Sequence, residues 1–258
     1  MLKEIKFSDH PVNIVSKFPL INAVVSNLQE GRIFGDERET FYFVFHKAAF
    51  SYLTISDRAN YPDLLSFFLQ SGELPIYFHI YDTPADLIDF CEAHNDKINI
   101  RVRKRIQLKY LDIKPPDQKV AVPHGFSVVK IDNSNFDDLS AFNLSLSDKF
   151  WRSKQDFLNN GFGFVVNNEA GIPVSICYAA CVANNAAEID VATLPAYQKQ
   201  GLARLVVAKF VAYSLDNGII PNWDCFEENY GSLKTAESLG FRYSCTYNFL
   251  SIFNKTKK

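Results

Sequence analysis

The most informative segment of the chain reads Glu188-Ile-Asp-Val-Ala-Thr-Leu-Pro-Ala-Tyr-Gln-Lys-Gln-Gly-Leu-Ala-Arg204. Its alternating start, rich in apolar residues, predicts a strand over 187–193. After a short turn, the apolar stretch 201–216 predicts a buried helix, because Arg204 and Lys209 are the charged residues among 202–215. The segment therefore predicts a strand, a turn and a rigid helix in direct succession.

The turn before this helix is suited to binding an anion. A helix start leaves about four backbone N–H groups unpaired and carries the positive end of the helix dipole. A pyrophosphate satisfies both. Gly201 has no Cβ and Ala203 is small, so that a phosphate can approach the backbone closely. We therefore expect an anion site at 199–203.

The rest of the sequence predicts an α/β (α+β) protein of two domains, divided at 120/121 within a Pro-containing linker near 115–123. In the N-terminal α/β domain, 1–120, the strand and helix patterns fall at 41–55, 61–70, 75–80, 83–94 and 98–110. In the second domain, 121–258, strands are expected at 126–131, 162–166, 173–183, 219–225 and 241–253, and helices at 134–147, 151–160 and 229–239.

Composition and charge exclude several classes of protein. The 258 residues are 47% hydrophobic and 22% charged, which is ordinary globular composition. Residues 1–120 hold 15 Lys/Arg against 16 Asp/Glu, and 121–258 hold 12 against 13, so that neither half is basic and no nucleic-acid partner is expected. No apolar run approaches the roughly 18 residues that span a bilayer. The charged start also lacks a secretory apolar segment. We therefore expect a cytoplasmic protein with no membrane partner.

Metal and hydrolase signatures are missing from the sequence. The five cysteines contain no Cys-x-x-Cys pair, and the five histidines lack metal-ligand spacing, so that free thiols and no metal are expected. There is no Gly-x-Ser-x-Gly nucleophile elbow and no complete dinucleotide fingerprint.

Two blocks resemble motifs of the GNAT superfamily, the acyl-CoA-dependent N-acyltransferases. The turn Gln198-Lys-Gln-Gly201-Leu-Ala203 fits the family pattern Gln/Arg-x-x-Gly-x-Gly/Ala, between a strand and a helix as that pattern requires. Downstream, Asn229-x-x-Ser232 followed by Leu239-Gly-Phe241 resembles the family's fourth helix. The resemblance covers about 124–258. The run Pro221-Asn-Trp-Asp-Cys225 is similar to a two-part subgroup that includes aminopolyol-antibiotic resistance acetyltransferases.

This resemblance implies a fold and a cosubstrate. The fold is a central mixed, mostly antiparallel sheet flanked by helices, and the cosubstrate is acetyl-CoA. The backbone of the 188–193 strand would pair with the pantetheine arm as an added strand. A backbone N–H near Val191 or Ala192 would polarise the thioester carbonyl. The implied cofactor contacts are Val191, Ala192, Thr193, Gln198, Lys199, Gln200, Gly201, Leu202, Ala203, Arg204, Asn229 and Ser232.

Catalysis requires that the acceptor amine lose a proton before attack. The resemblance places a general base at Glu188, while the alternative interpretation is a solvated or ion-paired carboxylate. Asp190, two residues on and on the same face, would serve as the base or bind the acceptor amine. The resemblance also places Trp151 in the region that walls the acceptor, although core packing is the commoner role of a large aromatic residue, and we favour packing for Trp223.

An acidic patch would recognise a polyamine or an aminoglycoside-like acceptor. The candidates for it are Asp148, Asp190 and Glu227. One departure from the family lies at Ala236, where relatives often carry a tyrosine that protonates the leaving CoA thiolate.

Three functions are compatible with these residues. The first is an N-acetyltransferase that moves an acetyl group from CoA to a primary amine of a small molecule by direct attack in a ternary complex; a homodimer is left open. The second is a non-catalytic acyl-CoA-binding sensor or interaction module, which the missing tyrosine favours. The third is a tandem aminoacyl transferase that uses charged tRNA, against which the neutral charge balance argues.

Overall fold

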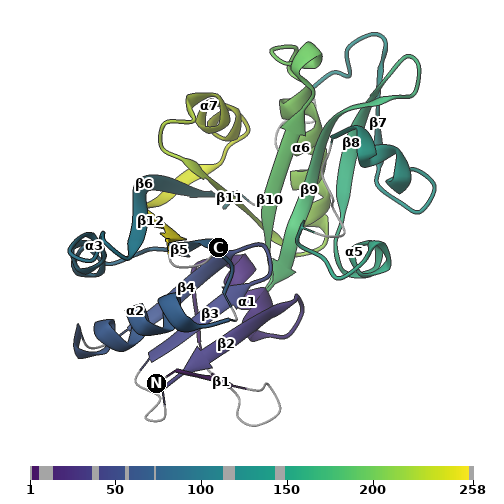
Figure 1. Ribbon diagram of the computed structural model, residues 1–258. Coiled ribbons are helices and arrows are strands. Elements are labelled where there is room, and N and C mark those ends of the chain that lie inside the picture. The colour runs from purple at the N-terminus through teal and green to yellow at the C-terminus, as the bar shows by residue number, and fades with distance from the viewer. Residues whose placement is uncertain are drawn as a thin grey trace. The chain divides into compact units, whose positions relative to one another are not determined.

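The computed structural model describes residues 2–5, 14–36, 41–55, 58–72, 74–112, 120–142 and 149–255. The chain divides into two compact units, Met1–Arg105 with Thr246–Lys258, and Ile106–Cys245 (Figure 1). These points of division differ from the boundary at 120/121 expected from the sequence. Much of the expected linker, 113–119, lies outside the described residues, so that this boundary stays a prediction.

The first unit is a mixed sheet with an aromatic core. Its strand order is β1-β2-β3-β4-β5-β12. The strands β4 and β5 are parallel, and the pairs β1–β2, β2–β3, β3–β4 and β5–β12 are antiparallel. The rings of Phe43, Phe68 and Phe78 lie 5.1–6.1 Å apart in its core. The elements are β1 (Lys3–Ile5), α1 (Pro19–Val25), β2 (Gly31–Gly35), β3 (Phe41–His46), β4 (Phe50–Ile55), a 3-10 turn (Arg58–Asn60), α2 (Tyr61–Gln70), β5 (Tyr77–Tyr81), α3 (Ala85–Glu92) and β12 (Arg242–Asn254).

The second unit is also a mixed, mostly antiparallel sheet, in the order β11-β10-β9-β8-β7, with the parallel pair between β10 and β11. The long strands β6 (Ile98–Lys109) and β12 have residues in both units. The other elements are β7 (Phe126–Lys130), a 3-10 helix (Phe136–Phe142), α5 (Lys154–Asn160), β8 (Gly163–Asn168), β9 (Pro173–Ala183), β10 (Ala186–Thr193), a 3-10 turn (Pro195–Tyr197), α6 (Leu202–Asp216), β11 (Ile220–Phe226) and α7 (Tyr230–Ser238). The mixed, mostly antiparallel sheet with flanking helices confirms the expected fold class.

Helix α6 is the central support of this unit. It packs along β8, β9 and β10 (Figure 1). Its buried apolar residues are Leu202, Leu205, Val206, Val207, Phe210 and Val211. Phe210 stacks on Phe162 with ring centroids 4.5 Å apart. This packing fixes the start of α6 beside the end of β10, where the anion site is expected.

The same order of strands and helix occurs in each unit, although the sequence shows no repeat. In each, an antiparallel strand pair leads into a helix and then into a strand parallel to the second strand of the pair. The segments are β3-β4-α2-β5 in the first unit and β9-β10-α6-β11 in the second.

Two expected helices differ from the structure. The described part of 134–147 forms a 3-10 helix over Phe136–Phe142, and 143–148 lies outside the described residues. The helix expected over 151–160 starts at Lys154, because Ser153 caps it by accepting a hydrogen bond from the N–H of Asp156 at 3.1 Å. Within the described ranges, no helix has the length and apolarity needed to cross a bilayer.

Candidate functional site

The strands β10 and β11 separate part-way along their length. Their parallel ladder covers three residue pairs and ends at the pair Glu188 and Asn222. Both strands continue, to Thr193 and Phe226, and β10 stays paired with β9 as far as Thr193. Among the residues that the structure describes, one edge of β10 from 189 to 193 therefore has no ladder partner, and an extended chain can add to such an edge as a further strand.

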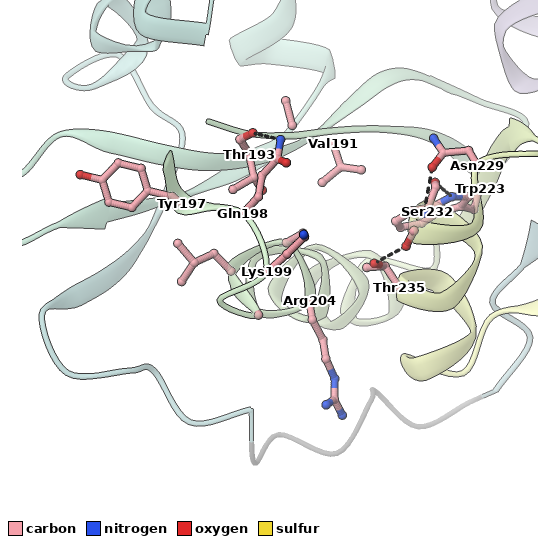
Figure 2. A pocket seen from close by; sticks show the side chains of 15 residues that line it. Val191, Thr193, Tyr197, Gln198, Lys199, Arg204, Trp223, Asn229, Ser232 and Thr235 are labelled. Atoms are coloured by element: carbon pink, nitrogen blue, oxygen red, sulfur yellow. Dashed lines mark hydrogen bonds between the residues drawn. The ribbon is translucent and has the colours of Figure 1, made fainter. Parts of the chain in front are cut away.

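A cavity of about 510 Å³ lies beside this free edge. Three elements supply its walls: the end of β10 with the turn into α6, the side chain of Trp223 on β11, and the first turns of α7 (Figure 2). The lining residues are Val191, Ala192, Thr193, Tyr197, Gln198, Lys199, Gly201, Leu202, Ala203, Arg204, Trp223, Asn229, Gly231, Ser232 and Thr235.

The turn into α6 and the first residues of this helix line the cavity. Lys199 and Gly201 adopt left-handed conformations, with φ of 60° and 79°. A Cβ built on Gly201 would meet nothing within 4 Å, so that the space in front of it is open. Gly201 caps α6 without a side-chain hydrogen bond, and the first turn carries no acidic residue. The positive end of this helix thus lacks an anionic group from its own first turn, as a phosphate site requires.

Side-chain amides brace this turn. The Nε2 group of Gln198 donates to the carbonyl of Thr193 at 3.2 Å, which ties the turn to the end of β10 (Figure 2). Gln200 donates to the carbonyl of Ala196 at 3.3 Å and is the one predicted cofactor contact that does not line the cavity. Arg204 lines the cavity, and its side chain extends away from the strand end in Figure 2.

The opposite wall is held by two hydrogen bonds to Ser232. Asn229 caps α7, and its Oδ1 accepts from the N–H of Ser232 at 3.1 Å. The indole N–H of Trp223 donates to the Ser232 hydroxyl at 3.0 Å. Trp223 is buried, as expected for a packing role, and it also reaches the cavity.

Sequence reasoning missed four lining residues: Tyr197, Trp223, Gly231 and Thr235. Tyr197 directly precedes the recognised motif. Gly231 and Thr235 lie near Asn229 on α7. Their spacing from Asn229 and Ser232 along the helix could have predicted that they line the same cavity.

Glu188 lies where the ladder between β10 and β11 ends. Its carboxylate Oε2 accepts a hydrogen bond from the Nδ2 group of Asn222 at 2.6 Å. Ala187 and Ile189 belong to the core that contains α6. Because side chains alternate along a strand, Glu188 and Asp190 project from the other face of the sheet.

Asp190 is already engaged by two partners. Its Oδ2 atom accepts from the Tyr178 hydroxyl at 2.7 Å and lies 3.1 Å from the Lys149 ammonium. Burial, and secondarily the Asp190 charge, raises the pKa of the fully buried Tyr178. Tyr178 therefore stays a hydrogen-bond donor, and the Asp190 carboxylate is held between Tyr178 and Lys149.

The other predicted acceptor contacts are not brought together by the described residues. Asp148 lies outside them, and Glu227 is exposed after β11. Trp151 is 1% exposed, and its indole N–H donates to the carbonyl of Ala179 at 3.0 Å. It supports the core in this structure, and its contact with an acceptor, like the acidic patch, stays a prediction.

The sequence model of the family described as GNAT acetyltransferase matches residues 17–250. The chain belongs to the GNAT acetyltransferase family. This confirms the resemblance found in the two motifs, and with it the assignment to an acyltransferase family whose cosubstrate is acetyl-CoA. The match also includes most of residues 1–120, to which the sequence motifs had assigned no role.

Relatives of the chain are similar over different lengths. An "Uncharacterized N-acetyltransferase YdfB" of Bacillus subtilis (strain 168) is 36% identical over 126 residues, 49% of this chain and 48% of that protein, so that the chain spans about half the length of this curated relative. A GCN5-related N-acetyltransferase-like protein of Streptococcus suis 89/1591 has a TM-score of 0.72 at 22% identity, over 95% and 94% of the two chains. A GNAT-family protein of Novosphingobium aromaticivorans DSM 12444 has a TM-score of 0.59 at 18% identity, over 96% and 100%. The two structures support the fold, and the aminopolyol subgroup stays a prediction.

Proposed function

We propose that this GNAT chain is an N-acetyltransferase that moves an acetyl group from CoA to a primary amine of a small molecule, by direct attack in a ternary complex. One observation carries the proposal: the free edge of β10, the open start of α6 and the capped start of α7 line a single cavity beside the point where β10 and β11 separate. The residues that line this cavity suit the pyrophosphate, the pantetheine arm and the acyl group of acetyl-CoA.

Each part of acetyl-CoA has a matching group. The N–H groups at 199–203 suit the pyrophosphate, because they lie at a helix start without an acidic residue. The free edge of β10 suits the amides of the pantetheine arm. Asn229 and Ser232 face this edge from α7. The acyl group then belongs at the inner end, near the last paired residues, Glu188 and Asn222.

The proposed reaction needs a base and an anion-stabilising donor. Glu188 takes one proton from the acceptor ammonium, and the freed lone pair forms the C–N bond with the thioester carbonyl carbon. A backbone N–H near Val191 or Ala192 donates to the carbonyl oxygen as it becomes negative. The C–S bond breaks, its electron pair leaves with sulfur, and the second amine proton is lost to water as the thiolate takes a proton. Because Ala236 replaces the family's tyrosine, we assign that last protonation to water.

A non-catalytic acyl-CoA-binding module is the second candidate. Ala236 is fully buried and does not line the cavity, so that its methyl group does not reach a leaving thiolate. Both candidates bind acetyl-CoA, and turnover with an amine separates them. For the enzyme, we propose a cytoplasmic location and a small-molecule acceptor.

Calorimetric titration of acetyl-CoA into wild type and Gly201→Glu tests the cofactor site. We expect micromolar binding to wild type, on the order of −8 kcal/mol. The substituted carboxylate repels the pyrophosphate and removes this binding. Gly171→Glu is the matched control, because Gly171 also has a positive φ, 75°, with nothing within 4 Å of a built Cβ, and does not line the cavity. Equal binding by wild type and both variants would refute the site.

Turnover is tested next with acetyl-CoA and a panel of amines: cadaverine, spermidine, glucosamine and kanamycin. Release of free CoA thiol that depends on one of these amines supports the enzyme. Tight binding of acetyl-CoA without thiol release for any of them supports the sensor.

A further inference from the structure

Asn222 makes an unusual set of contacts for a buried amide. Its side chain is 1% exposed. Its Nδ2 group donates to Glu188 Oε2 at 2.6 Å. Its Oδ1 atom is buried and has no hydrogen-bond partner in the part of the chain that the structure describes. The interaction with Glu188 is therefore the one hydrogen bond of this amide among the described residues.

Packing alone does not explain an asparagine at this position. A buried acceptor without a partner costs free energy, and a leucine of similar size would fill the space without that cost. The flanking residues Pro221 and Trp223 are buried, and strand β11 needs no side-chain amide to pair with β10. The amide cannot be reversed either, because its oxygen would then face a carboxylate, which accepts and does not donate when ionised.

Charge also favours an amide here. An N–H donor stabilises the ionised form of a carboxylate and fixes its orientation. A lysine or arginine would do the same but would repel a cationic acceptor. Asn222 supplies the donor without a charge, and the nearby ammonium of Lys149 is bound to Asp190 instead.

We propose that Asn222 is a positioning residue that orients the Glu188 carboxylate and keeps it ionised for proton abstraction from the acceptor amine. This inference rests on the proposed acetyltransferase function, in which Glu188 is the base. Asn222 is buried, so that it acts on the acceptor through Glu188 and does not touch it.

The titratable groups near Glu188 on the packed elements are few. Cys181 pairs with Glu188 across β9 and β10, and burial first, then the Glu188 charge, raises its thiol pKa. Asp190 follows on the same face, with Tyr178 and Lys149 as its partners. Cys181 and Tyr178 both stay neutral at physiological pH. The charged groups close by include Asp190, which is paired with Lys149, and Asp224, which lies two residues after Asn222 on the same face of β11.

Two substitutions separate the donor from the shape of Asn222. Asn222→Asp keeps the shape, removes the donor and adds a like charge next to Glu188. Asn222→Leu removes both polar atoms and keeps the approximate volume. The matched control is Asn167→Leu, because Asn167 on β8 also has a buried Oδ1 without a partner among the described residues, and β9 separates β8 from the strand that carries Glu188.

The expected kinetic result is a fall in kcat/KM for the amine, about 10-fold to 100-fold, in both Asn222 variants. Binding of acetyl-CoA by calorimetry stays within about twofold of wild type, since Asn222 does not line the cavity. The acid limb of the kcat/KM profile moves to higher pH, further in Asn222→Asp than in Asn222→Leu. Asn167→Leu retains the wild-type profile.

Stability supplies a readout that needs no acceptor. Asn222→Leu removes an unpaired buried acceptor, which favours the folded state, and also the donor to Glu188, which disfavours it while Glu188 is ionised. We therefore expect the thermal midpoint of the variant to improve relative to that of wild type as the pH falls and Glu188 becomes protonated. A difference in midpoint that is independent of pH, or an unchanged acid limb, would overturn the positioning role. If wild type binds acetyl-CoA but turns over none of the amines, the proposed function fails, and the pH dependence of this difference still decides whether Asn222 stabilises the Glu188 carboxylate.

Discussion

The indole N–H of Trp223 donates to the hydroxyl of Ser232 across 3.0 Å, and both side chains line the cavity. This bond joins β11 to α7 on the wall that faces the free edge of β10. Because the serine oxygen accepts from the indole, its own O–H must donate elsewhere, and it donates to none of the residues that the structure describes. The Ser232 hydroxyl is thus a donor available to a bound acyl-CoA.

Replacing Trp223 with phenylalanine tests this arrangement. The substitution keeps an aromatic ring and removes the N–H group, so that the Ser232 hydroxyl loses its fixed orientation. We expect acetyl-CoA to bind about fivefold more weakly, equivalent to roughly 1 kcal/mol for one hydrogen bond. Calorimetry measures this change, and circular dichroism checks that the variant is folded.

The second tryptophan is the control for that measurement. Trp151→Phe also removes an indole donor, the one that bonds the carbonyl of Ala179, but Trp151 does not line the cavity. We expect it to lower the free energy of unfolding by about 1 kcal/mol without weakening acetyl-CoA binding. An equal loss of affinity in both variants would show that the effect arises from the core.

The two carboxylates on β10 are separated by a different pair of substitutions. Glu188→Gln removes the proposed base, and we expect a fall in kcat of about 10²-fold or more. Tyr178→Phe removes one partner of Asp190 and leaves the Lys149 ion pair in place. It should lower stability by about 1 kcal/mol with a small change in kcat. The opposite ranking of the two kcat values would assign the base to Asp190.

The missing tyrosine at position 236 cannot be restored by substitution. Ala236 is fully buried in the core of the second unit, and a tyrosine there needs space that this core lacks. We expect Ala236→Tyr to lower the free energy of unfolding by about 1–3 kcal/mol and to leave kcat at or below the wild-type value. An increase in kcat in this variant would show that a general acid limits the reaction.

The sequence predicted the second unit closely because its local signals agree with its packing. The expected strand over 173–183 and the helix over 201–216 lie at Pro173–Ala183 and Leu202–Asp216. In both, the apolar pattern that suggests the element also fills the core. In the described part of the helix expected at 134–147, the buried apolar residues are Phe136 and Leu139, three positions apart, and this short segment forms a 3-10 helix.

The candidate site was predicted in part for a similar reason. The residues of the turn and of the α7 cap carry motifs in consecutive positions, so that they were found without a structure. Trp223 was not assigned to the site, because its place on the cavity wall depends on where β10 and β11 separate, a long-range property of the sheet. The contact of Asn222 with Glu188 joins residues 34 positions apart and was equally hidden.

The pH dependence of stability is set in part by His46, which is fully buried. The backbone N–H of Ala48 donates to its Nδ1 atom at 3.0 Å, so that its Nε2 carries the proton and donates to Gln29 Oε1 at 3.1 Å. Burial, and secondarily the charge of Lys47, lowers the pKa of His46 to about 3. Below about pH 6.5 the unfolded chain takes up a proton that the folded chain does not, so that His46 lowers the free energy of unfolding by about 1.4 kcal/mol per pH unit as the pH falls toward 4. Urea unfolding of wild type and His46→Gln across this range measures the effect. As the pH falls, the free energy of unfolding of His46→Gln should rise relative to that of wild type. A difference between the two that is independent of pH would contradict a neutral, buried His46.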